Sequence, residues 1–458
     1  MFSKETYIGR RHKLMSTVGS GLLLFLGNDE QGLNYEDNTF RYRQDSTMLY
    51  YFGLPFAGLA AILDIDEGRE ILFGDELTID SIVWMGTQPT LAERASHAGI
   101  TDIRPLASIA DYLTAAREAG RTIHFLPPYR AEHRLKLMDW LGLMPSRQQG
   151  SIPMIRAIVE QRNHKTAEEI AEIERACDIT ADMHLAAMRT IRPGLHEYDI
   201  VAEMMYVAHK ANCEESFATI ATVNGQTLHN HYHGNIIKPG DLFLIDAGAE
   251  LPSGYCGDMS STVPADPKFT PRQRAVYEIQ NAMHFAAVAA LRPGIAYMDV
   301  YDISAVAMVE GMKDLGLMKG DAKEAVAAGA HALFYPHGLG HMMGLDVHDM
   351  ENFGERWVGY AGKEKSTQFG RKSQRLAIPL EPGFVFTVEP GVYFIPELID
   401  LWKSERRFEE FINYDVVDTY RDFGGIRNEE DYLITADGAR RLGKKLPITP
   451  EEVEAEHC

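Results

Sequence analysis

The first third of the chain alternates short apolar runs with segments of helical periodicity. The apolar runs are bounded by glycine or charged residues, as buried strands commonly are, and the candidates are Leu22–Leu26, Ala60–Leu63 and Ile71–Phe73. Apolar residues recur at helical spacing near 105–119 and 130–142. Residues 1–155 are therefore predicted to form a mixed α/β domain.

The run Leu22–Leu26 follows Arg10-Arg11-His12-Lys13, which is the order of charged and apolar residues in a signal peptide. The run is only about half as long as a signal-peptide core, and no small-x-small cleavage site follows it. A first buried strand is the better interpretation. No stretch approaches the roughly 20 apolar residues of a membrane span.

The pattern changes near residue 155. Charged and apolar residues then recur at helical spacing, with Ile170, Ile173 and Ala176 on one face, which predicts a connecting helix over 156–178. We therefore expect an N-terminal domain over 1–155, this helix, and a C-terminal domain over 179–458.

The C-terminal half contains an internal repeat. Met183–Ala187 returns as Met283–Ala287, and each copy runs into a Pro-Gly pair, at Pro193 and Pro293. Each copy is predicted to form a helix, a Pro-Gly turn and a second helix. A duplicated α/β unit with a central cleft between its halves follows from this pattern.

A second feature of the repeat concerns acidic residues. Pro239-Gly240 leads through apolar residues to Asp246, and Pro382-Gly383 leads in the same way to Glu389, at the same interval of seven residues. Two carboxylates are thus predicted at equivalent strand positions in the two halves.

Four carboxylates and one imidazole lie beside strand-like runs or glycine turns in this half: Asp246, Asp258, His341, Glu389 and Glu429. Carboxylates that converge in a dry core repel one another unless they are protonated or hold cations. An oxygen-rich set with one imidazole suits a pair of divalent ions, Mn²⁺ before Zn²⁺. Taken singly, each has an ordinary alternative, such as a turn or cap for a strand-end aspartate, or an acidic solvated loop for Glu429.

Histidines cluster around these candidates. His337 and His348 flank His341, and His229, His231 and His233 precede Asp246. Hydrolysis of an acyl bond needs a group that steadies the oxyanion and a proton donor for the leaving nitrogen, and histidine supplies both. The cluster at 229–233 could instead form a separate metal site.

Composition narrows the class of protein. The chain carries 45 Lys and Arg against 66 Asp and Glu, a net charge of −21, which argues against nucleic acid or an anionic membrane as the main partner. Its apolar share of 45% suits a globular protein with a large core. The cysteines show no CxxC spacing, so reduced thiols in a cytoplasmic protein are expected; they are Cys177, Cys213, Cys256 and Cys458.

The acidic and histidine segments together resemble the metal-dependent Xaa-Pro peptidases, aminopeptidase P and prolidase, of the methionine-aminopeptidase-like pita-bread family. They span the C-terminal half, and they are Asp246–Glu250, Asp258–Thr262, His337–His341 with Gly344–Asp349, Glu381–Gly383 with Thr387–Gly391, and Gly425–Asp431. A weaker match to the family's creatinase-like amino domain comes from Phe40–Ser46 and Trp84. The resemblance implies an α/β fold, with a creatinase-like α/β domain followed by a pita-bread catalytic domain.

The resemblance also implies hydrolysis of the bond before proline by a hydroxide that bridges two divalent metal ions. Mn²⁺ is the expected metal, with Zn²⁺ or Co²⁺ as alternatives. Asp258 and Glu429 are our candidates for bridging carboxylates, while Asp246 would bind one ion and His341 and Glu389 the other. The implied partners are proline-containing di- or oligopeptides and a second copy of the chain, in a homodimer or higher homo-oligomer.

Roles for further side chains follow from the same resemblance. His348 would face the scissile carbonyl, and Glu389 would take a proton from the attacking water. His337 and one of two upstream histidines would line the pocket. His231 is favoured because His231-Tyr232 matches a family segment, and His229 stays open because the spacing to the first aspartate is not preserved. Arg427 would orient the neighbouring carboxylates.

Dipeptidase and aminopeptidase specificity remain alternatives. Arg375, fourteen residues before Glu389, stands where a prolidase has an arginine for the free carboxylate of its substrate. It could equally be a surface residue of a basic loop with Arg371 and Lys372. The long segment 394–423 is more similar to prolidase, whereas the N-terminal domain is more similar to aminopeptidase P.

Two departures from the family pattern accompany the match. The interval from Asp246 to Asp258 is one residue longer than usual, which a turn around Pro252–Gly254 would absorb. Asn428 replaces an apolar residue before the last ligand. The alternative functions are an organophosphorus ester hydrolase and a non-catalytic homologue that binds peptides or proteins.

Overall fold

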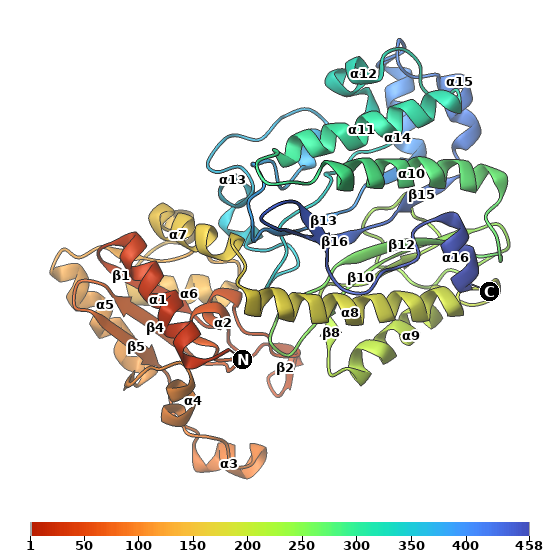
Figure 1. Cartoon of the computed structure of the whole chain (residues 1–458). Coiled ribbons are helices and arrows are strands. Elements are labelled where there is room, and N and C mark those ends of the chain that lie inside the picture. The colour runs from red at the N-terminus through yellow and green to blue at the C-terminus, as the bar shows by residue number, and fades with distance from the viewer. Residues whose placement is uncertain (1, 458) are drawn as a thin grey trace. The chain divides into compact units, whose positions relative to one another are not determined.

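The computed structural model describes residues 2–457 and divides into two compact units (Figure 1). One unit extends through Arg162 and includes Met350–Trp357. The other comprises Asn163–Asp349 and the chain from Val358 onward.

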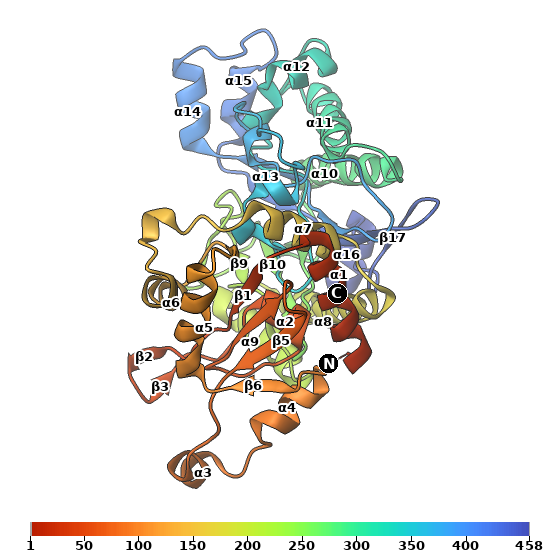
Figure 2. The same cartoon turned by 90° about the vertical axis from the view of Figure 1, so that its left-hand side faces the viewer.

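The N-terminal unit is built on one five-stranded mixed sheet. Its strand order is β6-β5-β4-β1-β7, with bounds Asp102–Arg104, Arg69–Phe73, Ala60–Asp64, Leu22–Leu26 and Ile123–His124. The central strand β1 pairs antiparallel with β4 and parallel with β7. Side chains of β1, β4 and β5 form a core with α5 (Ile109–Glu118) and α6 (Ala131–Leu141), which lie beside the strands in Figure 2. The predicted strands and helices of this domain are confirmed.

Five further helices and a hairpin complete this part of the chain. They are α1 (Lys4–Val18), α2 (Ser46–Phe52), α3 (Ile79–Met85), α4 (Leu91–His97), α7 (Ile152–Asn163) and the hairpin of β2 (Gly32–Tyr35) and β3 (Asn38–Thr39).

The predicted connecting helix over 156–178 is divided into two helices. α7 ends at Asn163, and α8 (Ala167–Thr190) begins two residues past Lys165. The break occurs because Thr166 caps α8: its side chain accepts a hydrogen bond from the backbone of Glu169, whose carboxylate accepts one from the backbone of Thr166.

The duplicated α/β unit predicted by the repeat has two similar halves. In the first, α8 packs on α9 (Glu197–Lys210) beside β9 (Ile220–Thr222), β10 (Leu242–Ala247) and β12 (Met259–Pro264). In the second, α10 packs on α11 beside β13, β16 and β17, with bounds Pro271–Ala290, Tyr297–Asp314, Val385–Val388, Glu430–Ile434 and Ala439–Arg441. Figure 1 shows the two helix pairs on opposite sides of the strands.

Equivalent turns confirm the duplication. Gly194 and Gly294 have positive φ values of 97° and 85°, a conformation that favours glycine because it has no Cβ. The backbone N–H of Gly194 donates to the carbonyl of Ile237, and that of Gly294 donates to the carbonyl of Leu380. Each Pro-Gly turn is therefore tied to the segment that leads into its own ligand-bearing strand.

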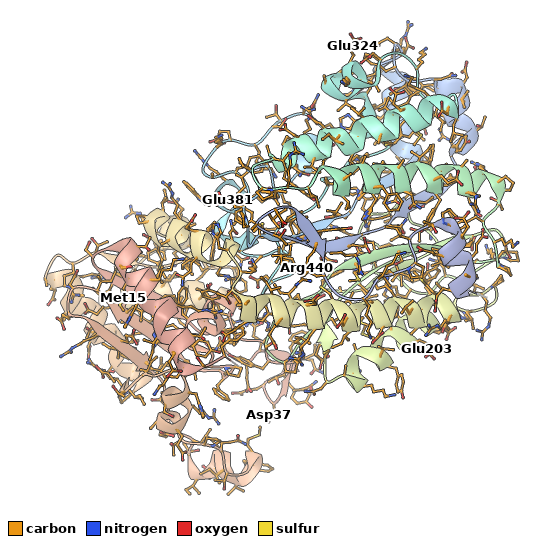
Figure 3. All side chains as sticks on the ribbon, viewed as in Figure 1. Met15, Asp37, Glu203, Glu324, Glu381 and Arg440 are labelled. Carbon is orange, nitrogen blue, oxygen red and sulfur yellow. The ribbon has the colours of Figure 1, made fainter. Side chains whose placement is uncertain are left out.

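Shorter elements fill the second half. A two-stranded sheet joins β14 (Gly391–Phe394) to β15 (Gly424–Arg427), and α12 (Ala322–Ala328) and α14 (Pro396–Ser404) also belong to this half. Acidic side chains such as Glu203 and Glu324 are exposed on the helices, as Figure 3 shows, so the excess negative charge is at least partly on the surface.

The structure also bears on the cysteines and on the search for a membrane span. Cys177, Cys213 and Cys256 are buried and form no disulfide among the described residues, and Cys458 lies outside that range. Across residues 2–457, no helix combines the length and apolar character that crossing a membrane requires.

Candidate metal centre

The first two candidate ligands come from neighbouring strands of one antiparallel pair. Asp246 lies near the end of β10, opposite Ser260 of β12, and Asp258 immediately precedes β12. The hairpin between them turns at Leu251–Tyr255, with Gly254 at a positive φ of 88°. The turn lies where the sequence predicted that the extra residue of this interval would be absorbed, and Asp246 lies on the strand.

The other carboxylates come from the second half. Glu389 follows β13, and Glu429 lies between β15 and β16 in a single β-bridge with Ser260. The Ser260 hydroxyl donates to Glu429 Oε2 over 2.7 Å. Glu429, Glu430 and Asp431 are all buried, so the alternative of an acidic solvated loop is wrong.

His341 is held by a contact of one ring nitrogen with the backbone. Its Nδ1 lies 3.1 Å from the carbonyl of Met342, so Nδ1–H donates there and Nε2 carries a lone pair. His341 Nε2 lies 3.3 Å from Asp258 Oδ2 and 3.7 Å from Glu389 Oε1. Fixing the tautomer by a backbone carbonyl is the usual second contact of a metal-binding histidine.

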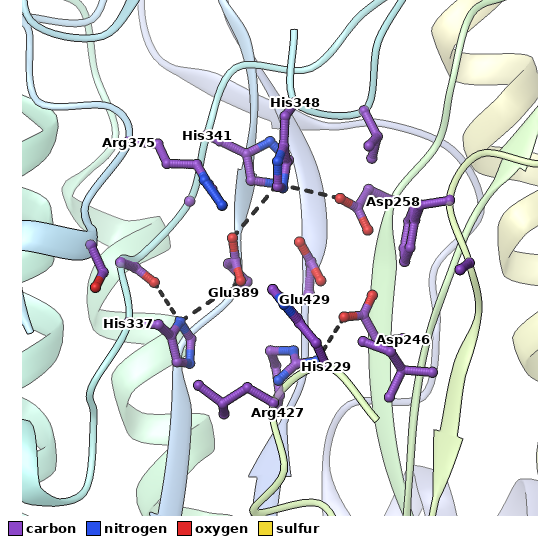
Figure 4. Close-up of a pocket in the computed structure, with 18 of the residues that line it drawn as sticks. His229, Asp246, Asp258, His337, His341, His348, Arg375, Glu389, Arg427 and Glu429 are labelled. Carbon is purple, nitrogen blue, oxygen red and sulfur yellow. Dashed lines mark hydrogen bonds and ion pairs between the residues drawn. The ribbon is translucent and has the colours of Figure 1, made fainter. Parts of the chain in front are cut away.

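The five side chains surround one cavity of about 520 Å³ (Figure 4). Ligand atoms of Asp258, His341 and Glu429 lie within 4.8 Å of one another. Glu389 adjoins this group through His341, and Asp246 enters it beside Arg427, whose Nη2 donates to Asp246 Oδ2 over 2.7 Å. The structure thus brings together the five residues that the sequence singled out.

These residues fit a pair of divalent cations. The second oxygens of Asp246 and Asp258, both named Oδ1, are buried and have no hydrogen-bond partner among the described residues. Unpaired buried carboxylate oxygens are costly unless a cation balances them. Four carboxylates with a single imidazole offer the oxygen-rich ligand set that hard or borderline divalent ions prefer.

The electrostatics of the site support the same interpretation. Burial raises the pKa of Asp258 and that of Glu429 well above their ordinary values, and the neighbouring carboxylates raise them further. Burial raises the pKa of Glu389 to about 7, against the lowering effect of His341 and Arg427. Without a cation, these groups favour their neutral forms; bound divalent ions would restore the charged forms.

Arg427 is the centre of a buried network that the sequence indicated only in part. Its guanidinium donates to Asp246, to the Ser260 hydroxyl over 3.0 Å and to the Tyr393 hydroxyl over 2.7 Å. The predicted orienting role for Arg427 agrees with these contacts. Ser260 and Tyr393 were missed, because a serine and a tyrosine within apolar strands carry no local signal of a site.

His337 joins this network from the other side. Its Nδ1 donates to the carbonyl of Gly338 over 2.7 Å, so its Nε2 accepts from the Tyr393 hydroxyl, 2.9 Å away. Burial and the nearby Arg427 lower the pKa of His337 to about 3. His337 is therefore a neutral imidazole at the cavity wall, 3.8 Å from Glu389.

The remaining histidines divide between the cavity and the scaffold. His229, His231 and His348 line the cavity, and the ring of His348 stacks edge-on against His341 at 4.2 Å. His233 instead lies 3.1 Å from the carbonyl of Thr219 and does not line the cavity. Of the residues described, only Asp258, His341 and Glu429 form a group of three possible metal ligands, so no separate centre forms at 229–233.

Arg375 also lines the cavity, and Figure 4 shows its side chain directed into it. Arg371, its neighbour in the basic loop, pairs with Asp302 over 2.6 Å instead. Apolar wall residues that the sequence did not single out are Phe217, Ile220, Leu228 and Val347.

Comparisons with known proteins agree with this geometry. Residues 171–436 match the model of metallopeptidase family M24, and residues 7–124 match that of the aminopeptidase P N-terminal domain. The chain is 29% identical to the human Xaa-Pro dipeptidase, covering 99% of this chain and 92% of that protein. It is 32% identical to the Xaa-Pro aminopeptidase of Escherichia coli K12, covering 99% and 97%.

Solved structures show the same similarity over the whole chain. The aminopeptidase PepP of Pseudomonas aeruginosa superposes with a TM-score of 0.82 at 28% identity, covering 100% of this chain and 98% of that one. A zinc-substituted aminopeptidase P of Escherichia coli in complex with product gives 0.81 at 29% identity, with the same coverage. The expected α/β architecture, an amino domain followed by a pita-bread domain, is confirmed.

Proposed function

The chain belongs to metallopeptidase family M24, and from this premise we propose that it hydrolyses the peptide bond before proline with two divalent metal ions. The observation that carries the proposal is the convergence of Asp258, His341 and Glu429, whose ligand atoms lie within 4.8 Å of one another, beside Asp246 and Glu389. The relatives that match 99% of this chain in sequence are named as Xaa-Pro peptidases.

The metal ligands in this proposal are Asp246, Asp258, His341, Glu389 and Glu429, with Asp258 and Glu429 shared between the two ions. Divalent ions held by these residues would lower the pKa of a bound water and would polarise a carbonyl oxygen. Mn²⁺ is our expected metal because oxygen ligands predominate.

Polar side chains of the cavity are proposed to transfer protons, contact the oxyanion and bind the substrate. Glu389 accepts the proton of the attacking water and passes it toward the leaving proline nitrogen. His348, packed against His341, donates toward the carbonyl oxygen as negative charge develops there. His229 and His231, which also line the cavity, bind the substrate backbone together with His337.

A proline substrate explains the mixed character of the cavity wall. Proline has no amide N–H and a fixed φ, so a site for it must rely on shape and apolar contact. Phe217, Ile220 and Leu228 supply apolar surface near His229. Arg375 offers a guanidinium to a substrate carboxylate, the contact that favours a dipeptide.

The non-catalytic alternative is less well supported, because the five ligand candidates converge on one cavity. No contact of the described residues favours an organophosphorus ester over a peptide. A cytoplasmic location and a homodimer or higher homo-oligomer remain predictions of the resemblance.

The test is to compare cleavage of Ala-Pro and Ala-Pro-Ala by metal-free protein and by protein reloaded with Mn²⁺. We expect metal-dependent release of proline or of Pro-Ala. Faster cleavage of the dipeptide identifies a dipeptidase, and faster cleavage of the tripeptide identifies an aminopeptidase. Cleavage of neither by the Mn²⁺-loaded protein contradicts the proposal.

A further inference from the structure

The first helix of each half faces the strands that carry the ligands, and the repeat relates their positions by 100 residues. Thr180 on α8 thus corresponds to Gln280 on α10, as Met183 corresponds to Met283. The Thr180 hydroxyl accepts the backbone N–H of Ala249, just beyond β10. Both helices therefore use this position to bind the backbone near a ligand.

Gln280 makes the more extensive contact of the two. Its side chain is fully buried, and its Nε2 donates to the carbonyl of Pro390 over 2.8 Å and to that of Asn428 over 3.3 Å. Pro390 directly follows Glu389, and Asn428 directly precedes Glu429. One amide nitrogen thus binds the backbone next to two proposed metal ligands that come from distant segments.

Asn428 completes the arrangement from the other direction. Its Nδ2 donates to Gln280 Oε1, and its Oδ1 accepts the backbone N–H of Thr262 on β12 over 3.1 Å. The orientation of both amides is fixed, because the carbonyls of Pro390 and Asn428 can only accept and the N–H of Thr262 can only donate. Asn428 is 3% exposed and stands where the sequence departs from the apolar residue of the family pattern.

We propose that Gln280 and Asn428 form a positioning pair that holds Glu389 and Glu429 at the spacing required for metal binding. The pair links α10 and the ends of two strands in the second half to β12 of the first half, which begins beside Asp258. Repulsion among buried carboxylates pushes these strands apart, and the amide bridge opposes that separation. The inference rests on the proposed metal ligands and adds residues that contact neither metal nor substrate.

Calorimetric titration of Mn²⁺ into metal-free protein tests the pair without relying on turnover. We expect Gln280→Met and Asn428→Leu each to weaken Mn²⁺ binding by about 10- to 100-fold, the usual cost of losing a residue that supports a ligand. The double variant should bind no more weakly than the worse single variant, because both changes remove the same bridge.

Asn281→Leu is the matched control. Asn281 is the next residue on α10, is 6% exposed and donates to the carbonyl of Ile448 over 2.8 Å, away from the ligands. Asn281→Leu should lower the thermal unfolding midpoint. It should leave the Mn²⁺ affinity within about twofold of native, since Asn281 supports no ligand. If the variants of the pair behave like Asn281→Leu, the pair is only core packing and the inference is wrong.

The double variant keeps the test possible if the single variants do not fold. It removes both amide side chains together, so neither amide is left without the other. If neither single variant folds, an unchanged Mn²⁺ affinity in the double variant overturns the inference, and a weakened one supports it. A native protein that binds no Mn²⁺, or cleaves no prolyl bond when loaded, contradicts the proposed function itself. Native binding and turnover with unaffected variants contradict the positioning role alone.

Discussion

The two halves of the catalytic unit supply their ligands in different ways. The first half places Asp246 and Asp258 on one hairpin, twelve residues apart, where strand pairing fixes their relation. The second half gathers His341, Glu389 and Glu429 from three separate segments, and residues 394–423 intervene between the last two. A short hairpin positions its ligands by local geometry, whereas the second half depends on buried polar contacts between distant segments.

The largest expected effect is loss of a proposed bridging carboxylate, one from each half. Asp258→Ala and Glu429→Ala should each lower kcat for Ala-Pro by more than about 100-fold, since even a supporting residue commonly costs 10- to 100-fold in activity. Circular dichroism should show that the fold is retained, and exposed Glu203→Ala serves as the control. Near-normal turnover of either variant after metal replacement would rule out the bridging assignment.

The next effect concerns a buried ion pair between the break that precedes α8 and the segment after His348. Lys165 Nζ lies 2.8 Å from Asp349 Oδ2, and both side chains are 1% exposed. Lys165→Met should lower the free energy of unfolding by about 3–5 kcal/mol, because it removes one member of a buried ion pair.

Denaturant unfolding measures this effect, and Lys313→Met supplies the control. Lys313 pairs with Glu310 on the surface of α11 at 2.9 Å, so its removal should cost less than about 1 kcal/mol. Equal losses from the two variants would mean that the buried pair contributes no more than a surface one.

The next prediction tests whether Arg375, in the second half, binds the carboxylate of a dipeptide substrate. Arg375→Ala should lower kcat/KM for Ala-Pro by about 10- to 100-fold, the value of a hydrogen bond to a charged group, and affect Ala-Pro-Ala less. Arg371→Ala, in the same loop but paired with Asp302, should change neither rate. Equal losses on both substrates would exclude Arg375 as the carboxylate anchor.

The smallest effect is the pH dependence of the metal-free protein. The folded-state pKa of Glu389 is about 7, above its ordinary value of 4.5. Between pH 4.5 and pH 7, the native state therefore holds a proton on Glu389 that the unfolded state has lost. The stability from this group is complete below pH 4.5 and is lost as the pH rises through 7.

Thermal unfolding of metal-free protein should therefore show a falling midpoint from pH 5 to pH 7.5. Glu389→Gln, which cannot ionise, should reduce that fall, because its side chain stays neutral in both states. An equal fall of the midpoint in native protein and in this variant, or no fall in native protein, would contradict the role of Glu389.

Much of the site could be predicted from the sequence because its signals are local. The strand containing Asp246, the turn beside Gly254 and the Pro-Gly pairs of the repeat all depend on short-range patterns, and the structure confirms them. The five ligand candidates could be predicted from the sequence because carboxylates beside apolar runs are unusual in a core.

The rest could not be predicted, because it depends on which segments meet. The Ser260–Glu429 bridge joins residues 169 positions apart, and the role of Tyr393 appears only when Arg427 and His337 approach it. The connecting helix was predicted as continuous because apolar periodicity outweighed the capping signal of Thr166.

The position of the ligands at the seam between two similar halves has a practical consequence. The segment between β12 and α10 exposes Pro267 and Lys268. A chain divided there leaves Asp246 and Asp258 on one fragment and the other three ligand candidates on the second. Neither fragment alone has a complete ligand set, so catalytic activity would report their reassembly, and the fold offers a natural split point for a complementation assay.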